Sequence, residues 1–413
     1  MSTFASPRGS RDILPDQNRL WQHVKQVCAD VAHELSFHEI TVPTFEDIGL
    51  FQRSLGEGTD IIDKELFLVR GRHSDEEHYA LRPEGTAGIV RAFIQNGLKT
   101  YPQPVRLYSV LNLFRYERPQ RGRYREHVQF DIEQFGTKEA SADAWVILTQ
   151  WRVLQRLGIN DAALSLNSLG TNEERMQYQQ ALIHYFTPFF EQLSNDSKRR
   201  LSTNPLRILD SKDPLDQPHL PGAPHLSTFL MQESREHLAQ VQAHLDTWQV
   251  PYALDPLLVR GLDYYSRTCF EWSVPAAEGR PLALGGGGRY DGLVPLLGGP
   301  DLGAVGGGLG LDRLVDLLEE RGWTPPAPRA KLAVINVDLL PEQAAYCIIP
   351  LLEQHLALWS DFSRTSTASQ LKAASKEQCT FALLVSSNGL ELKELISGSQ
   401  QRVTLEQVGD AVT

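Results

Sequence analysis

Residues 105–136 read VRLYSVLNLFRYERPQRGRYREHVQFDIEQFG, which predicts two long β-strands joined by a loop rich in arginine. In the second strand polar and apolar side chains alternate, so Val128, Phe130 and Ile132 are predicted to lie on one face. The opposite face carries His127, Gln129, Asp131 and Glu133. This polar face is either the solvated side of an antiparallel sheet or the wall of a small-molecule pocket, and the alternation alone favours the solvated side.

The composition is that of a globular chain with room for two or three domains, since it has 413 residues, of which 41% are hydrophobic. No run approaches the roughly 20 apolar residues that span a bilayer, and the first residues lack the apolar core of a secretory signal. The cysteines Cys28, Cys269, Cys347 and Cys379 lie far apart, which argues against a zinc site or a disulfide framework. We therefore expect a cytoplasmic protein without a membrane segment. The net charge of -11 gives no sign of an overall basic nucleic-acid-binding chain, although a local basic face remains compatible with it.

Periodicity and composition divide the chain into five segments. Residues 17–36 predict an amphipathic helix, and a second helix is expected from Ala87. Beyond residue 331, strand-like runs alternate with a helix after Pro341, which predicts a small α/β domain with a mostly parallel sheet. The predicted segments are 1–170, rich in strands; 171–250, mostly helical and charged; 251–322, strand-like again; 323–330, a proline-rich linker; and 331–413, the α/β domain.

A run of four glycines in PLALGGGGRYDGLV, residues 281–294, raises the question of a phosphate-binding loop. Such a loop needs a following helix and usually a lysine, and the chain contains no GxxxxGKS/T motif. A GxGxxG fingerprint and an HExxH motif are absent as well. A nucleotide site on this chain would therefore lie on a sheet and use arginines.

Four arginines are candidates to bind phosphate or carboxylate groups: Arg115, Arg123, Arg260 and Arg313. The fixed fork of donors of a guanidinium suits such oxygens, although each arginine alone is more typical of a surface salt bridge. Arg115 and Glu117 share a strand face and precede a turn with further arginines, an arrangement that could hold a polyphosphate from two sides. In the stretch RPEGT, Thr86 is placed to cap a helix and Glu84 to pair with an ammonium group.

Several motifs together resemble those of histidyl-tRNA synthetases, which are class II aminoacyl-tRNA synthetases. LVRGLDYY (258–265) and GGGRYDGLV (286–294) are similar to the two histidine-specific motifs of that family, and their combination with the other motifs is highly specific. The other similar stretches are PRGSRDILP (7–15), EITVPTFED (39–47), GEGTDIIDKELF (56–67), FRYERPQRGRYREHVQFDIEQFG (114–136), NSLGTNEER (167–175), NPLRILDSK (204–212) and GGGLGLDRL (306–314). The resemblance covers nearly the whole chain.

The resemblance implies an α+β fold, in which an antiparallel class II sheet flanked by helices is followed by a small α/β anticodon-binding domain. The catalytic domain would combine residues 1–170 and 251–322, with 171–250 as a helical insertion. The implied reaction converts L-histidine and ATP, with Mg²⁺, to histidyl-adenylate and pyrophosphate and then transfers histidine to the 3′ end of tRNA-His. A homodimer with Pro43 at its interface is also implied.

Two other classes of protein share part of this resemblance. One is a regulatory subunit of ATP phosphoribosyltransferase, which typically lacks the C-terminal domain and has degraded motif arginines. The other is a noncatalytic tRNA-sensing module fused to a kinase. The intact RGLDYY stretch and motif arginines argue against the first class, and the absence of a kinase segment argues against the second.

The resemblance also implies a role for each candidate residue. Those implied to bind histidine are Glu84, Thr86 and Gln129 at the α-amino group, Glu133 and Tyr265 at the imidazole, Tyr264 and Tyr290 in the pocket, and Arg260, which with Arg115 contacts the substrate carboxylate and the α-phosphate of ATP. Those implied to bind ATP are Arg115 at the α-phosphate, Arg123 and Arg313 at the β- and γ-phosphates, and Glu117 and His127 at the adenine. Arg115 and Arg260 are the catalytic candidates, and Gly287–Gly292 would shape the floor of the histidine pocket.

Overall fold

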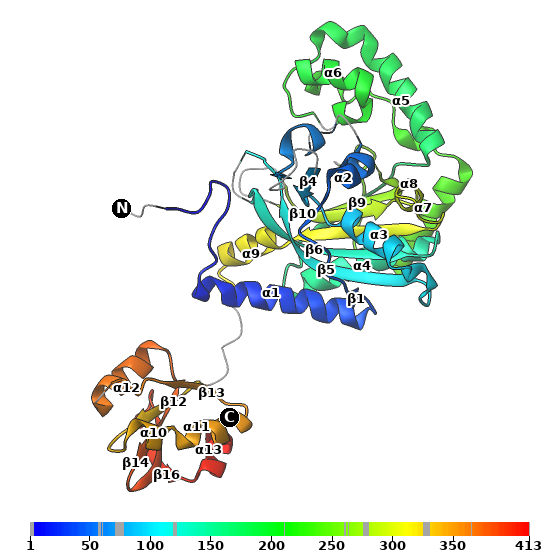
Figure 1. Ribbon diagram of the computed structural model, residues 1–413. Helices are drawn as coiled ribbons and strands as arrows, with labels where there is room; N and C mark the ends of the chain where they lie inside the picture. Colours follow the sequence, from blue (N-terminus) through cyan, green and yellow to red (C-terminus); the bar gives the residue numbers. More distant parts are fainter. Residues whose placement is uncertain are drawn as a thin grey trace. The chain divides into compact units, whose positions relative to one another are not determined.

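The computed structural model describes residues 4–56, 59, 61–70, 78–118, 122–209, 211–259, 262, 264–275, 281–324, 331–364 and 366–412. The chain divides into two compact units, Met1–Thr324 and Pro325–Thr413, which are drawn in Figure 1. Among the described residues, no helix has both the length and the apolar character that a membrane crossing requires.

An eight-stranded sheet forms the centre of the first unit, with strand order β1-β5-β6-β11-β10-β9-β7-β8. Its neighbours pair antiparallel except at the two edges, where β1 pairs with β5 and β7 with β8 in parallel. The predicted antiparallel sheet is therefore present. The strands are β1 His38–Glu39, β5 Val105–Phe114, β6 Glu126–Phe135, β7 Ala163–Ser168, β8 Ala253–Leu254, β9 Ser266–Val274, β10 Leu282–Arg289 and β11 Ala304–Gly310.

One face of this sheet is covered by helices that share its main hydrophobic core (Figure 1). The alternation in β6 sends Val128, Phe130 and Ile132 into that core, as the sequence predicts. Helix α1 (Pro15–Glu34) contributes a buried stripe that includes Val24 and Val31, because apolar residues recur at helical spacing along it. The other helices on this face are α4 (Ala140–Arg156), α7 (Gln232–Thr247) and α9 (Leu311–Glu320).

A second core packs on the opposite side of the sheet, where helix α3 (Thr86–Gln95) places Phe93 against Phe135 of β6. Helix α3 follows a three-stranded sheet with order β2-β4-β3. The elements on this side are β2 Phe45–Asp47, α2 Ile48–Leu55, a π-helical turn Ile61–Glu65, β3 Leu68–Arg70, β4 His78–Leu81, a 3₁₀ turn Leu98–Thr100 and α8 Leu293–Leu296.

The segment predicted to be helical, 171–250, contains α5 (Asn172–Phe186), α6 (Asn195–Thr203) and α7. Helix α5 begins with a capping box, in which Thr171 and Glu174 satisfy each other's backbone N–H groups. Helix α7 packs on α4 and β9, so this segment belongs to the first compact unit. Short 3₁₀ turns link the helices at Thr187–Gln192, Pro205–Ile208, Gln217–His219 and Leu226–Thr228.

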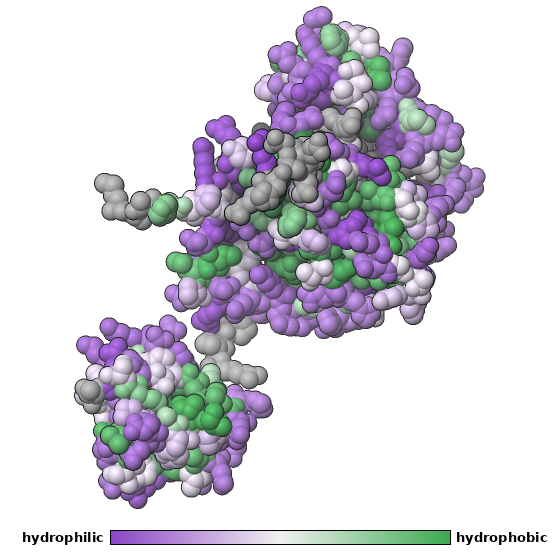
Figure 2. All heavy atoms as spheres, in the orientation of Figure 1, coloured by the Kyte–Doolittle hydropathy of each residue, from purple (hydrophilic) through white to green (hydrophobic). Residues whose placement is uncertain are grey.

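The second unit is built on a five-stranded sheet with order β13-β12-β14-β15-β16. Its strands are β12 Lys331–Asn336, β13 Ala357–Ser360, β14 Phe381–Ser386, β15 Gly389–Glu394 and β16 Gln400–Val403. Its helices are α10 Pro341–Ala344, a 3₁₀ turn Ala345–Cys347, α11 Ile348–Glu353, α12 Thr367–Lys376 and α13 Leu405–Val412. Hydrophobic residues also reach the surface of this unit (Figure 2), among them Tyr346, Ile349 and Leu352.

The prediction of a mostly parallel sheet in this unit is wrong. Strand β12 pairs in parallel with β13 and β14, but β15 pairs antiparallel with both β14 and β16. The cause is a hairpin: the two-residue turn Ser387–Asn388 is followed by Gly389 at φ 117°, a backbone conformation that glycine adopts without strain.

Candidate active site

A cavity of about 290 Å³ lies over the polar face of β6 and β11 in the first unit. The candidate residues that line it are Glu84, Thr86, Arg115, Glu117, Arg123, His127, Gln129, Tyr264, Tyr265 and Arg313. Glu133 and Tyr290 lie behind this lining, bonded to one another, and Arg260 lies outside the described residues. The polar face of β6 is therefore the wall of a pocket, which the alternation alone did not favour.

Backbone carbonyls orient two of the three cavity arginines. Arg115 Nε donates to the Pro83 carbonyl at 2.8 Å, and Arg313 donates to the carbonyls of Gly122 at 3.1 Å and Ala283 at 2.5 Å. Arg123 lies 3.4 Å from Glu117 Oε2 and is half exposed. Three guanidinium groups in one cavity create a site for a polyanion, since an arginine fork pairs with phosphate oxygens at two points.

His127 lies between the cationic groups of this part of the cavity. Burial, together with the nearby charges of Arg115 and Arg313, lowers the pKa of His127 to about 3. The imidazole is therefore neutral at physiological pH and adds no fourth positive charge to the cavity.

The same cavity also has buried carboxylates in and behind its lining. Glu84 accepts hydrogen bonds from the backbone N–H groups of Thr86 and Ala87, both at 2.8 Å, and so caps helix α3 with its carboxylate. The prediction that Thr86 caps this helix is wrong, because Thr86 is its first residue and its hydroxyl donates to Glu133 Oε1 at 2.7 Å. Burial raises the pKa of Glu84, and it raises the pKa of Glu133 well above its usual value.

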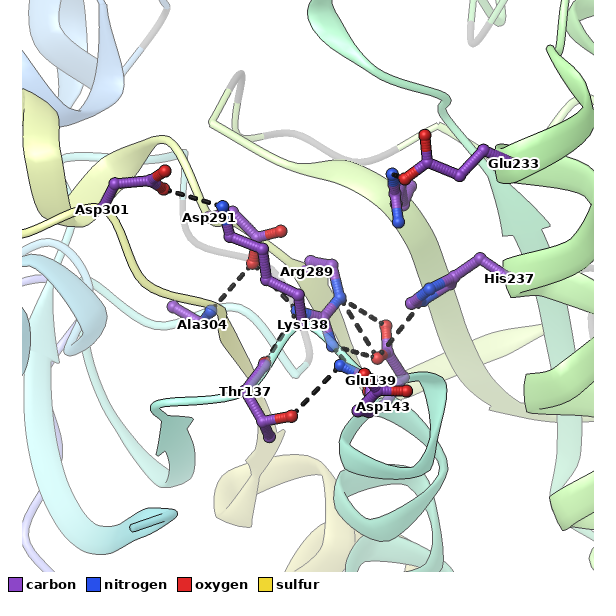
Figure 3. Close-up of polar contacts among 11 residues, drawn as sticks. Thr137, Lys138, Glu139, Asp143, Glu233, His237, Arg289, Asp291, Asp301 and Ala304 are labelled. Atoms are coloured by element: carbon purple, nitrogen blue, oxygen red, sulfur yellow. Dashed lines mark hydrogen bonds and ion pairs between the residues drawn. The ribbon is translucent and has the colours of Figure 1, made fainter.

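Glu133 does not reach the cavity lining, because its two oxygens are bonded to Thr86 and to the hydroxyl of Tyr290. Tyr290 is in turn held by its neighbour Arg289, which is fully buried. Arg289 donates to the carbonyls of Thr137 at 3.2 Å and Glu139 at 3.1 Å (Figure 3). The turn that carries Tyr290 is thus anchored to the segment that leads into α4.

Two glycine-rich strands form the back of the cavity. Gly285 and Gly286 of β10 line it together with Gly307 and Gly308 of β11, whereas Gly287–Gly292 are absent from the lining, contrary to expectation. A Cβ on Gly308 would lie 1.7 Å from Gln129 Nε2, so only glycine leaves room for that side chain. The glycine run is a strand, and it brings the backbone close to the pocket as expected.

Asp131 is a cavity residue to which the sequence analysis assigned no role. Its Oδ1 accepts a hydrogen bond from Gln129 Nε2 at 2.6 Å. Burial, with a further contribution from the charge of Glu84, raises the pKa of Asp131 to about 7 against the opposing effects of Gln129, Arg82 and Arg115. The strand alternation placed Asp131 on the correct face, but it gave no reason to separate it from a solvated aspartate.

The comparisons with known proteins agree with this geometry. The sequence profile of the histidyl-tRNA synthetase family matches residues 9–175 and 222–314, which is more than half of the chain. The chain belongs to the histidyl-tRNA synthetase family. The predicted family and the α+β class II fold are therefore confirmed.

Relatives from bacteria match along almost their whole length. The histidine–tRNA ligase of Synechococcus sp. (strain JA-3-3Ab) is 42% identical over 407 residues, which cover 97% of this chain and 96% of that protein. The histidine–tRNA ligase of Marinomonas sp. (strain MWYL1) is 40% identical over 412 residues, covering 97% and 96%. The crystal structure of apo histidyl-tRNA synthetase from S. aureus aligns with a TM-score of 0.82 at 29% identity, covering 99% of this chain and 100% of that one.

Proposed function

We propose that this chain is a histidine–tRNA ligase, which activates L-histidine with ATP and transfers it to the 3′ end of tRNA-His. The observation that carries the proposal is one cavity that is lined both by arginines and by the buried carboxylates Glu84 and Asp131. A zwitterionic amino acid and a nucleoside triphosphate suit such a cavity, because the arginines can pair with the phosphates and the substrate carboxylate while the buried carboxylates can pair with the ammonium group.

The α-amino group of histidine binds beside Glu84, Thr86 and Gln129. The imidazole ring lies toward Tyr264 and Tyr265, with Glu133 and Tyr290 behind Thr86 as the polar support of that side. A site that hydrogen-bonds both ring nitrogens rejects an analogue without them by on the order of 10⁴ or more, because buried polar groups are left unpaired.

Arg115 and Arg260 bind the α-phosphate and the histidine carboxylate, and Arg123 and Arg313 bind the β- and γ-phosphates. Glu117 contacts the adenine and His127 stacks on it. A carboxylate oxygen of histidine attacks the α-phosphorus, the bond to the β-phosphate oxygen breaks, and pyrophosphate leaves. The arginines neutralise the negative charge that develops at phosphorus, and no general base is required because the carboxylate is already ionised.

In this proposal Mg²⁺ is bound by the phosphates of the nucleotide. Within the described parts of the chain, no group of three or more His, Cys, Asp or Glu side chains could hold a metal ion. Mg²⁺ commonly binds through substrate phosphates and water with few protein ligands. When bound there, it supplies charge neutralisation to the departing pyrophosphate.

The remaining parts of the proposal concern tRNA and assembly. Residues 331–413 bind the anticodon, residues 171–250 form the helical insertion of a catalytic domain built from 1–170 and 251–322, and residues 323–330 link the two parts. The chain acts as a cytoplasmic homodimer with Pro43 at its interface. These assignments are supported by the family resemblance along the whole chain.

The experiment that tests this function is aminoacylation. Purified protein, ATP, Mg²⁺ and tRNA from the same cells are incubated with each radiolabelled amino acid in turn, and acid-precipitable label is counted. We expect labelled tRNA with histidine alone, and we expect Arg260→Ala to abolish the signal while size-exclusion chromatography still shows a folded dimer. Charging by another amino acid, or none by histidine, would rule the function out.

A further inference from the structure

Asp131 carries a buried carboxylate oxygen that has no hydrogen-bond partner among the described residues. The residue is 2% exposed and lies in the cavity lining. Its Oδ1 accepts from Gln129 Nε2 at 2.6 Å, but Oδ2 has no partner within the parts of the chain that the structure describes. A buried carboxylate oxygen without a partner is costly when ionised, so a cation bound against it would stabilise its charged form.

Two glycines enclose this carboxylate. A Cβ on Gly85 would lie 2.2 Å from Asp131 Oδ2, and a Cβ on Gly308 would lie 2.5 Å from Asp131 Oδ1. Gly85 precedes α3 and Gly308 belongs to β11, so backbone without side chains approaches the carboxylate from both directions. The carboxylate is therefore held in one place at the edge of the cavity.

The two other buried carboxylates in and behind the cavity lining are already engaged. Glu84 uses both oxygens to accept the backbone N–H groups that begin α3, and Glu133 uses both to accept the hydroxyls of Thr86 and Tyr290. Asp131 differs because only one of its oxygens has a partner within the described residues.

We propose that Asp131 Oδ2 receives the α-ammonium group of the amino-acid substrate, and that Asp131 is thereby a substrate-positioning residue of this site. The inference rests on the proposed function, because it takes histidine as the substrate. Gln129, which is also assigned to the α-amino group, orients Asp131, since its amide donates to Asp131 Oδ1 and both side chains line the same cavity.

The charges around Asp131 favour a bound cation. Glu84 faces Asp131 from the segment before α3, and Glu133 lies on β6, the same strand as Asp131. Arg82 and Arg115 act in the opposite sense, but Arg82 donates to three backbone carbonyls, at 2.7 to 3.0 Å. Strand β11 contributes glycine backbone on the remaining side. Burial and Glu84 therefore dominate, which raises the pKa of Asp131 to about 7, and an ammonium group would favour its ionised form.

The test compares two ligands that differ in the amine. Isothermal titration calorimetry at pH 8 measures the binding of L-histidine and of imidazolepropionate, which lacks the α-amino group, to wild-type protein and to Asp131→Asn. We expect Asp131→Asn to weaken histidine binding roughly 10- to 100-fold, the value of a charge-assisted hydrogen bond. Binding of imidazolepropionate should change by less than about threefold, because a neutral amide leaves the rest of the pocket intact.

The matched control is Asp301→Asn, which makes the same chemical change at an exposed aspartate paired with Lys138. It should bind both ligands as the wild type does. An equal loss of both ligands in Asp131→Asn would show a merely structural role, and unchanged histidine binding would exclude the contact. Either result overturns the proposed role of Asp131. The proposed ligase function is unaffected by such a result as long as the wild-type protein shows histidine-dependent activity. Absence of histidine binding by the wild type would overturn both.

A measurement on the wild type keeps the proposal testable if the variant does not fold. The ratio of histidine affinity to imidazolepropionate affinity is measured from pH 8 to pH 6, which cancels the titration of the imidazole ring common to both ligands. Protonation of Asp131 removes the partner of the ammonium group, so the ratio should fall as the pH drops through about 7. A ratio that stays constant across this range would contradict the proposal.

Discussion

Arg289 and Asp143 form a fully buried ion pair in the first unit, with Arg289 Nε 3.2 Å from each carboxylate oxygen and Nη2 donating to Oδ2 (Figure 3). The two residues are 146 positions apart in the chain. His237 of α7 reaches the same carboxylate at 3.4 Å. The pair ties the end of β10 to helix α4, directly before Tyr290, and thus supports the turn that carries Tyr290.

Asp143→Ala should destabilise the protein by about 3–5 kcal/mol, because it leaves the Arg289 charge buried without its partner. Urea unfolding followed by circular dichroism measures the loss. The control is Asp161→Ala, which breaks the exposed pair with Arg321 and should cost a small fraction of that amount. A similar loss of unfolding free energy in both variants would show that the buried pair stabilises the protein no more than an exposed pair does.

The pH dependence of this pair has a defined sign. Burial raises the pKa of Asp143, but the charges and hydrogen bonds of Arg289 and His237 together outweigh burial and lower the pKa to about 2. A lowered pKa in the folded state stabilises the protein above the unfolded value of 3.8, and this stabilisation is lost as the pH falls toward 2. The difference in unfolding free energy between wild type and Asp143→Asn should therefore be constant above about pH 4 and shrink below it. A difference that does not shrink in acid would exclude this assignment.

Gly308→Ala should raise the KM for histidine, since its Cβ would lie 1.7 Å from Gln129 Nε2 and displace that amide. We expect an increase of order 10- to 100-fold with the fold retained, because the obstructing atoms are ends of side chains. Gly292→Ala is the matched control, with open space around the added atom, and its KM should remain that of the wild type. Steady-state pyrophosphate exchange measures both, and an unaltered KM in Gly308→Ala would refute the close packing.

Arg313→Lys should lower kcat/KM for ATP by about 10²-fold, because a lysine cannot reproduce the fork that is oriented by the Gly122 and Ala283 carbonyls. Arg321→Lys, just after the end of α9, changes an exposed arginine in the same way and should leave the ATP kinetics unchanged. Equal kcat/KM values for ATP in the two variants would show that Arg313 does not bind ATP.

The sequence alone predicted what depends on local pattern. The alternation in β6 correctly separated Val128, Phe130 and Ile132 from the polar face, and helical spacing correctly placed α1. Family motifs then selected the residues that the fold brings into one cavity. The alternation could not decide whether the polar face met solvent or a pocket, because that depends on which elements cover it.

Features that depend on distant parts of the chain were not predicted. The partner of Arg289 lies on a helix far away in sequence, and the surroundings of Asp131 Oδ2 depend on Gly85, which packs against it from a different part of the chain. The antiparallel half of the second sheet does have a local signal, because the Ser387–Asn388 turn followed by Gly389 is typical of a hairpin, whereas strand–helix alternation alone predicts parallel pairing.

The joint binding of histidine and ATP is tested most directly by pyrophosphate exchange in the absence of tRNA. Purified protein is supplied with ATP, Mg²⁺, labelled pyrophosphate and one amino acid at a time, and label entering ATP is counted. Exchange that depends on histidine and is lost in Arg115→Ala is the predicted result. Exchange without histidine, or exchange that persists at the wild-type rate in Arg115→Ala, would contradict the assignment of this cavity.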